Sequence, residues 1–322
     1  MKRSIIISLI VSGSLLALGI ILFITAMAIS GFKFAEVFTT ASYDTVTHDI
    51  NDDFDSISIN TTTADVKILP SKNGTTRVVC PDNKKLTHIV EVTDGALSIE
   101  GNDERRWFDH LSIVNNNSPE ISVYLPKEEY EALSIDLATG DVRVGKFTFS
   151  SVNIEVTTGD VECLASSVGE IKIHATTGDI GVSGASAGSI DLKSTSGLVN
   201  IFAITSDGNI NIKSTTGKSI LTKVACKNLT INSGSGDSKM KNVIVSETIS
   251  IDKTTGDVEF DACDAADLKI KVTTGSVEGT LLTGKVFITH TTTGDIEVPR
   301  TIIGGICEIT TTTGDVEIEI SK

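Results

Sequence analysis

Ten segments of the chain repeat one alternation of apolar and polar positions around a glycine. Seven residues before each glycine the position is always apolar. Five residues before it, nine of the ten copies are apolar, with Thr289 as the exception. The residue between these two positions is usually polar. A period of two is typical of a short β-strand with one buried face, so each copy predicts a strand that leads into the glycine.

A second predicted strand follows each glycine. Two residues after it, eight of the ten copies have Val or Ile, and four residues after it nine of the ten are apolar. A weaker apolar position seven residues after the glycine predicts a third short side. The turn between the strands reads Thr-Thr-Gly-Asp or a close variant. Glycine suits a turn position with positive φ, and an aspartate can cap such a turn with its side chain.

The repeats follow each other at intervals of 19 or 20 residues, from Gly140 to Gly314. One such unit cannot bury its apolar face alone, whereas stacked units bury a continuous core. The spacing therefore predicts an all-β fold, a single-stranded parallel β-solenoid with coils of about 19 residues. The predicted structural turn residues are Gly140, Asp141, Gly159, Asp160, Gly178, Asp179, Gly256, Asp257, Gly294, Asp295, Gly314 and Asp315.

Residues 34–132 follow the same scheme less regularly, and residues 133–322 form the regular array. One weak copy has Ala64 where the glycine would stand, and another is centred on Gly95. An insert at 101–118 holds the single Trp of the chain. No linker rich in Pro or Ser separates these parts, so we expect one continuous solenoid.

The N-terminus has the pattern of a membrane anchor. Lys2 and Arg3 precede an uncharged, mainly apolar run from Ser4 to Ser30, and about 20 apolar residues suffice to span a bilayer. Residues 1–33 therefore predict a single transmembrane helix, with the N-terminus cytoplasmic and the solenoid extracellular. A cleaved signal peptide is the alternative, because Ala26-Met27-Ala28 resembles a cleavage site.

Charge and cysteine content narrow the functional classes. The net charge of −15 argues against a nucleic-acid partner, because phosphate binding needs a basic face. Five cysteines in 322 residues do not form a disulfide scaffold. Cys163, Cys263 and Cys307 occupy apolar phases of the repeat and are expected to be buried. We expect no cofactor.

The repeat, apolar-x-apolar-x-Thr-Thr-Gly-Asp-Val, follows an N-terminal span and a strand that ends in Val123-Tyr124-Leu125-Pro126. In these features residues 45–322 resemble the bacterial putative-adhesin β-strand-repeat family, a group defined as a domain of unknown function. The resemblance implies a membrane-tethered or exported protein, and some members of the family are similar to components of cell-envelope stress systems. It implies no catalytic residues.

Two features are candidates for binding. In stacked coils the turn aspartates would lie about 5 Å apart and could bind Ca²⁺, but Leu198, Lys218 and Ser276 interrupt the series. We therefore expect turn capping and no metal site. The segment Arg105, Arg106, Trp107 and Phe108 departs most from the repeat, and Trp and Arg are frequent anchors at interfaces. It is the candidate partner contact.

The sequence favours a non-catalytic, adhesin-like surface interaction module that is tethered to the plasma membrane. Its partner would be a protein or a cell-wall polymer. The first alternative is an accessory or sensor protein of a cell-envelope stress or signalling system. A carbohydrate-active β-helix enzyme is the second alternative, but such enzymes need carboxylates clustered in a cleft, and here the acidic residues follow the repeat.

Overall fold

The computed structural model describes residues 2–29, 43–104, 119–165 and 167–321. Contacts divide the chain into two units. Unit 1 comprises residues 1–43 and 104–117, and unit 2 comprises residues 44–103 and 118–322. Unit 2 holds all 25 strands of the described chain and carries the predicted repeat.

Unit 1 contains helix α1 (Lys2–Ile29), whose side chains are described for residues 12–25. No helix in the described part of the chain is long and apolar enough to cross a membrane. The predicted transmembrane helix is therefore not found.

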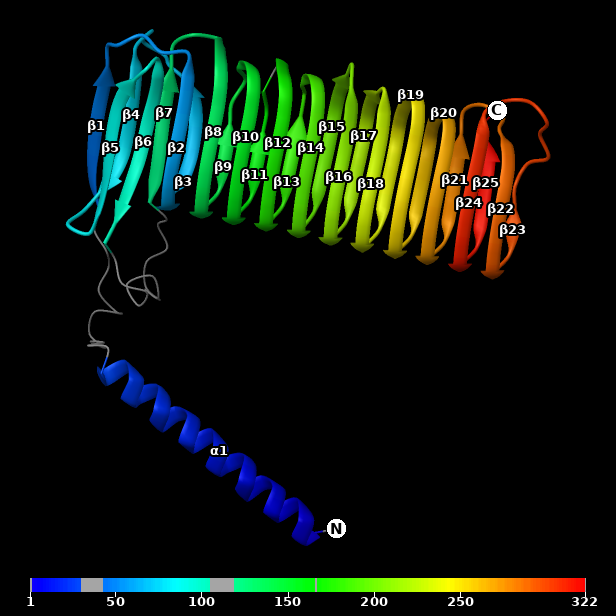
Figure 1. Cartoon of the computed structure of the whole chain (residues 1–322), viewed down its shortest axis with the longest axis horizontal. Coiled ribbons are helices and arrows are strands. Elements are labelled where there is room, and N and C mark those ends of the chain that lie inside the picture. Colours follow the sequence, from blue (N-terminus) through cyan, green and yellow to red (C-terminus); the bar gives the residue numbers. More distant parts are fainter. Residues whose placement is uncertain (1, 30–42, 105–118, 166, 322) are drawn as a thin grey trace. The chain divides into compact units, whose positions relative to one another are not determined.

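Unit 2 is a β-solenoid with two long faces (Figure 1). The first face consists of the strands that lead into the repeat glycines, together with two strands of the irregular N-terminal part that pair beside them. They are β2 (Ser56–Thr63), β6 (Ala96–Asp103), β8 (Glu129–Thr139), β10 (Thr148–Thr158), β12 (Ser167–Thr177), β14 (Ser186–Ser196), β16 (Asn209–Thr216), β18 (Asn228–Ser235), β22 (Val286–Thr293), β24 (Ile306–Thr313) and the second halves of β19 (Ser238–Thr255) and β20 (Val258–Thr274).

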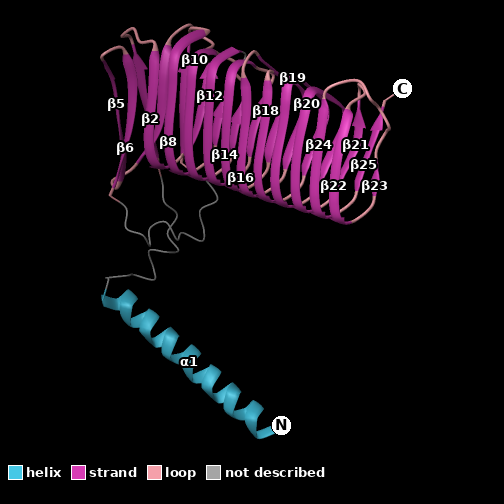
Figure 2. Ribbon diagram, turned by 45° about the vertical axis from the view of Figure 1, so that its right-hand side comes forward, coloured by secondary structure: helices cyan, strands magenta, loops and turns pink. Residues whose placement is uncertain are grey.

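The second face consists of the strands that follow the turns. They are β3 (Asp65–Pro70), β7 (Glu120–Leu125), β9 (Val142–Val144), β11 (Val161–Cys163), β13 (Ile180–Ser183), β15 (Val199–Ser206), β17 (Ser219–Cys226), β21 (Val277–Leu281), β23 (Ile296–Glu297), β25 (Val316–Ile320) and the first halves of β19 and β20. Side chains alternate between buried and exposed along both faces, as the period of two predicts. The strands of successive coils lie side by side along the solenoid (Figure 2).

Neighbouring coils pair in parallel and in register from β8 onward, so each repeat position forms a ladder along the solenoid. For example, Ile154 of β10 pairs with Ile135 of β8 and with Ile173 of β12. The predicted all-β parallel solenoid is therefore confirmed for the regular array. Its core is the set of inward Ile, Val and Leu positions, most of them less than 3 % exposed.

The third side begins at a sharp corner six residues after the repeat glycine. In four consecutive coils this corner is Ala203, Lys223, Asn242 and Ala262, each with φ between +52° and +57°. The residue after the corner turns inward, as in Ile204, which is 1 % exposed. One left-handed residue thus redirects the chain and produces the weak apolar position that the sequence indicates.

At both ends of the solenoid the order of the strands in the sheet differs from their order in the chain. At the C-terminal end β24 lies between β20 and β22, and β25 lies between β21 and β23. The chain therefore forms the outermost coil, β22 with β23, before it returns to fill the layer beneath. At the other end β2 lies between β6 and β8, although β6 comes later than β2 in the chain.

The N-terminal end also contains antiparallel strands, which the predicted parallel solenoid lacks. β1 (Asp44–Ile50) pairs antiparallel with β4 (Thr76–Asp82), which pairs antiparallel with β7. β5 (Leu86–Thr93) forms a hairpin with β6 through Asp94 and Gly95, both with positive φ. The prediction of a weak solenoid copy at Gly95 is therefore wrong, because an Asp-Gly pair in this conformation forms a hairpin turn.

Four aromatic rings pack where this irregular end meets the regular array. Phe54 stacks on Tyr130 with ring centroids 5.9 Å apart, and Tyr130 contacts Phe147 and Phe149 at 6.2 and 6.1 Å. All four rings are buried. They join a residue before β2 to the first coils of the regular array, which extends one core through the whole of unit 2.

Candidate functional site

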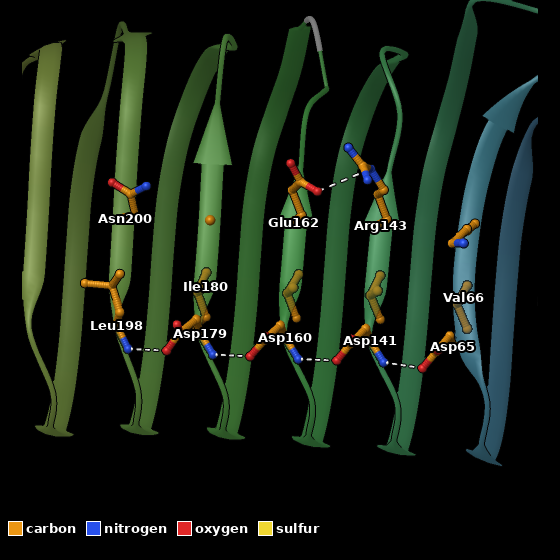
Figure 3. A pocket seen from close by; sticks show the side chains of 14 residues that line it. Asp65, Val66, Asp141, Arg143, Asp160, Glu162, Asp179, Ile180, Leu198 and Asn200 are labelled. Carbon is orange, nitrogen blue, oxygen red and sulfur yellow. Dashed lines mark hydrogen bonds and ion pairs between the residues drawn. The ribbon is translucent and has the colours of Figure 1, made fainter. Parts of the chain in front are cut away.

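A shallow groove of about 540 Å³ lies on the second face, over β3, β9, β11, β13 and β15 (Figure 3). Its floor is the outer surface of the sheet, next to the predicted turn aspartates. The polar residues that line it are Asp65, Lys67, Asp141, Arg143, Asp160, Glu162, Asp179 and Asn200. The groove runs across successive coils and is open to solvent along its length.

The hollow has a local cause in the sequence. Three residues after the repeat glycine, an outward side chain stands on each of these strands, such as Arg143, Glu162 and Asn200. On β13 this position is Gly181, so a side chain is missing between Glu162 and Asn200. A Cβ built on Gly181 would meet only Val161 O, at 3.8 Å. The space above Gly181 is therefore empty rather than filled by a neighbour.

One ion pair forms a wall of the groove. Arg143 Nε lies 3.2 Å from a carboxylate oxygen of Glu162, and both side chains are about half exposed. Exposed pairs of this kind contribute at most about 1 kcal/mol to stability. Both charges are accessible from solvent.

The turn aspartates form a hydrogen-bonded ladder along the groove (Figure 3). The backbone N–H of Asp141 donates to Asp65 Oδ1 at 3.0 Å, Asp160 donates to Asp141 at 2.9 Å and Asp179 donates to Asp160 at 2.7 Å. Leu198 ends the ladder by donating to Asp179 at 2.7 Å. The aspartates thus cap the neighbouring coil, and not their own turn as the repeat predicts.

A second ladder follows the C-terminal coils. Asp257 and Ser276 donate their backbone N–H groups to Asp237 and Asp257, and Asp295 donates to Asp315 at 2.9 Å. In this last hydrogen bond the donor, Asp295, comes earlier in the chain than the acceptor, Asp315, because the outermost coil is out of chain order. Between the two ladders, Lys218 Nζ lies 3.0 Å from Asp237 Oδ2. The hydrogen bond from Lys218 lowers the pKa of the Asp237 carboxyl group.

This arrangement also bears on the metal hypothesis. One oxygen of each carboxylate in the ladder already accepts a backbone N–H group. Each coil contributes one carboxylate, so these groups follow the coils and do not converge on one point. Among the described residues, no group of three or more His, Cys, Asp or Glu side chains is placed to hold a metal ion. The candidate partner contact at Arg105, Arg106, Trp107 and Phe108 lies outside the described residues.

The repeat glycines have a steric role that no other residue can fill. All ten have φ between +116° and +149°. A Cβ at any of them would lie 1.8–2.3 Å from the carbonyl oxygen of the corresponding turn residue in a neighbouring coil. Ala64 is accepted at the equivalent position of β2 and β3, where φ is not positive. The predicted turn residues are thus placed where two coils approach most closely.

The core beside the turns is partly polar, which the repeat pattern did not predict. Three residues before the repeat glycine, inward positions hold Ser194, Ser214, Ser233 and Lys253, all buried. Lys253 is 1 % exposed, and its Nζ donates to Ser238 Oγ at 2.8 Å. Burial lowers the pKa of Lys253 to about 8, against the opposing effect of Asp237 and Asp257. The signal was a lysine at a position that is Leu, Val, Ala, Ser or Thr in the other copies.

The cysteine thiols are buried and protonated. The structure has free thiols at Cys80, Cys163, Cys226, Cys263 and Cys307, and all five are buried. Desolvation raises the pKa of Cys163 to about 11 and those of Cys80, Cys226 and Cys307 to about 12. A thiol must lose its proton to act as a nucleophile, so these residues act as small apolar core residues.

Comparison with solved structures finds the same fold in one bacterial protein and weaker likenesses in others. A putative adhesin from Parabacteroides distasonis superposes with a TM-score of 0.51 at 10 % identity, over 87 % of this chain and 99 % of that one. A putative lipid binding protein from the same species has a TM-score of 0.47 at 16 % identity, over 86 % and 97 %. A putative adhesin from Bacteroides fragilis has 0.41 at 16 % identity, over 87 % and 100 %.

No curated protein shows significant similarity to the chain. The family model described as Toastrack DUF4097 matches residues 54–217 and 203–322, which together include nearly all of the solenoid. The two matches overlap within the regular array, as expected of a family whose unit is the repeated coil. The chain therefore belongs to the Toastrack DUF4097 family, a bacterial putative-adhesin domain of unknown function.

Proposed function

We propose that the solenoid is a non-catalytic, adhesin-like surface module that holds an extended polar partner in the groove on its second face. The observation that carries the proposal is the hollow at Gly181. It interrupts a row of outward side chains and exposes charged and amide groups of successive coils along one line. A linear polymer or an extended peptide can contact such a row at several coils at once.

The chemistry of the groove favours binding over turnover. Its carboxylates are spread along a ladder in which each caps the next coil, whereas acid–base catalysis needs groups that converge on one reacting atom. The buried thiols have raised pKa values and supply no nucleophile. Arg143, Lys67 and Asn200 provide donors, and the free carboxylate oxygens provide acceptors, which suits a partner rich in hydroxyl or amide groups.

The proposed partner is a cell-wall polymer or a surface protein, and the proposed location is the cell surface. The uncharged run from Ser4 to Ser30, preceded by Lys2 and Arg3, supports a tether at the plasma membrane with the solenoid outside. The name of the related putative adhesin agrees with this role, but at 10 % identity that likeness extends to the fold alone.

The substitution Gly181→Gln tests the groove. The glutamine fills the hollow without backbone strain, because φ of Gly181 is not positive and the nearest atom to the added Cβ is 3.8 Å away. We expect unchanged stability and at least about tenfold weaker binding, a loss of about 1.4 kcal/mol. The measurement is binding of the full chain to isolated cell-wall polymer and to surface-protein fractions by biolayer interferometry.

The matched control is Asn211→Gln, an exposed site on the first face. It should leave binding unchanged. Equal binding by wild type and Gly181→Gln would remove the groove from the proposal. Release of soluble fragments from the bound polymer would show that the module is an enzyme.

A further inference from the structure

Exposed apolar side chains gather at one end of the solenoid. Outside α1, nine large apolar side chains of the described residues are exposed, and six of them lie between residues 282 and 306. They are Leu282, Ile288, Ile296, Ile302, Ile303 and Ile306. Ile302 and Ile303 are 92 % and 78 % exposed. The loop that carries them, between β23 and β24, extends beyond the last strands at this end (Figure 1).

This loop is anchored at its base. Thr301 Oγ1 donates to Lys285 O, and Val286 N donates to Gly305 O at 2.8 Å. Gly304 has φ +112°, and a Cβ there would lie 2.0 Å from Gly284 O. The contacts hold Ile302 and Ile303 in place at the end of the solenoid. Grouped apolar exposure of this kind marks a contact surface.

The same end has an open strand edge. Among the described strands, β22 pairs only with β24, and β23 pairs only with β25. The outer N–H and C=O groups of β22 therefore point away from the solenoid. A further strand satisfies these groups in a regular pattern, whereas a lipid surface does not. The occupant that fits this edge is a polypeptide strand.

The longer strand of this edge lacks the charges that usually protect such strands, and the edge carries one charge, Glu297 in the two-residue strand β23. β22 has the sequence VFITHTTT, without Asp, Glu, Lys or Arg. The edge strands at the opposite end are charged, with two aspartates in β1 and Glu91 in β5. Charged residues on an edge strand discourage pairing with another chain. The two ends thus differ in the way expected if only the C-terminal end pairs.

We propose that a second copy of this chain covers the C-terminal end, with β22 antiparallel to β22 of the second copy around a two-fold axis. An uncharged strand can pair with itself, because no like charges come to lie opposite each other. A two-fold contact uses the same surface of both copies and closes at the dimer. The contact is separate from the groove, so either can fail without the other.

Charge complementarity supports this symmetry. The loop with Arg300 lies where β22 starts, and the turn with Asp295 lies where β22 ends. A two-fold axis perpendicular to the sheets places the start of β22 in one copy opposite the end of β22 in the other. Arg300 of one copy then lies at the same height along the strands as Asp295 of the other. Both residues are exposed, and no ion pair is found for either within the described chain. The same exchange brings Ile302 and Ile303 toward Ile296 of the second copy.

The test is the mass of the full chain in detergent, measured by light scattering after size-exclusion chromatography. We expect a dimer, and we expect Ile288→Lys to raise its dissociation constant at least about tenfold by placing charges at the paired edge. Ile89→Lys is the matched control, because Ile288 and Ile89 are both 56 % exposed and both lie on edge strands, at opposite ends. It should leave the dimer intact.

Charge exchange tests the axis itself. Arg300→Asp should weaken the dimer, and adding Asp295→Arg to it should restore the dimer. A monomeric wild type at about 100 µM would overturn the proposal. A dimer that survives Ile288→Lys would place the contact elsewhere, for example at α1, and a mass above the dimer would contradict the closed symmetry. A last outcome concerns lipid. If wild-type monomer binds vesicles of phosphatidylcholine and phosphatidylglycerol and the Ile302→Ser, Ile303→Ser double variant does not, the loop is a lipid contact, which would also overturn the proposal of a dimer.

Discussion

Replacing Gly178 with alanine is expected to lower the free energy of unfolding by about 3 kcal/mol or more. Gly178 has φ +136°, a conformation open to glycine and strained for any residue with a Cβ. The added Cβ would lie 2.0 Å from Gly159 O, so the coils must also move apart. Backbone strain and overpacking each cost about 1–3 kcal/mol. The measurement is urea unfolding of the full chain, followed by far-ultraviolet circular dichroism.

Gly181→Ala provides the matched control three residues away. Its φ is not positive, and its added Cβ would contact only Val161 O at 3.8 Å. We expect its free energy of unfolding to stay within about 0.5 kcal/mol of that of wild type, as for most surface substitutions. Equal midpoints for the two variants would show that the glycine ladder does not limit the approach of the coils.

Replacing Lys253 with methionine is expected to raise the free energy of unfolding by about 2 kcal/mol at pH 7. The pKa of Lys253 is lowered from 10.5 to about 8, mainly by burial. This shift corresponds to a cost of about 3 kcal/mol for keeping the charged ammonium in the folded core. Methionine removes that cost but leaves Ser238 Oγ without its donor, which offsets about 1 kcal/mol.

The pH dependence gives the sign of the effect. Between pH 8 and 10.5 the unfolded chain holds the Lys253 proton and the folded chain does not, so this group makes stability rise with pH. Below pH 8 both states are charged and the full cost is present. The advantage of Lys253→Met should therefore shrink as pH rises from 8 toward 10.5. The readout is the difference between the unfolding midpoints of the two proteins at each pH.

Lys213→Met is the control, because Lys213 is exposed on the first face. It should change stability by less than about 0.5 kcal/mol at every pH. A Lys253→Met protein that is less stable than wild type at pH 7 would mean that the buried ammonium is stabilised by its surroundings. A constant difference across the pH range would mean that Lys253 titrates as it does in water.

The sequence was sufficient for the regular coils because each repeat position has one environment. The position five residues before the glycine faces the core in every coil, and Ile135, Ile154 and Ile173 there are at most 1 % exposed. The one exception, Thr289, belongs to β22, the outermost coil, where it is only partly buried. The weakest copy of the pattern therefore marked the end of the stack.

The order of the end coils could not be predicted. Apart from Thr289, the last two coils share the same apolar phases, so the period of the pattern predicts two stacked coils and does not give their order. At the other end, Asp94-Gly95 was a hairpin signal that the repeat spacing concealed. A periodic pattern defines which face of a strand is buried, but it does not define which coil lies beside it.

The candidate site follows from differences between copies and not from the repeat itself. The groove exists because Gly181 stands where other coils have a side chain, and this difference is visible in the aligned repeats. Lys253 is likewise visible as a charged residue at an inward position. The aspartate ladder needed the structure, because its hydrogen bonds join residues 19 or 76 positions apart in the chain.

Protease accessibility of the solenoid on intact cells is the most direct test of a surface interaction module. Residues 44–322 should be digested by added protease while residues 1–33 stay in the membrane fraction. Permeabilising only the outer layers of the envelope provides the control for shielding. A solenoid that remains protected after this treatment, yet is digested once the cells are lysed, would place it inside the cell and contradict the account.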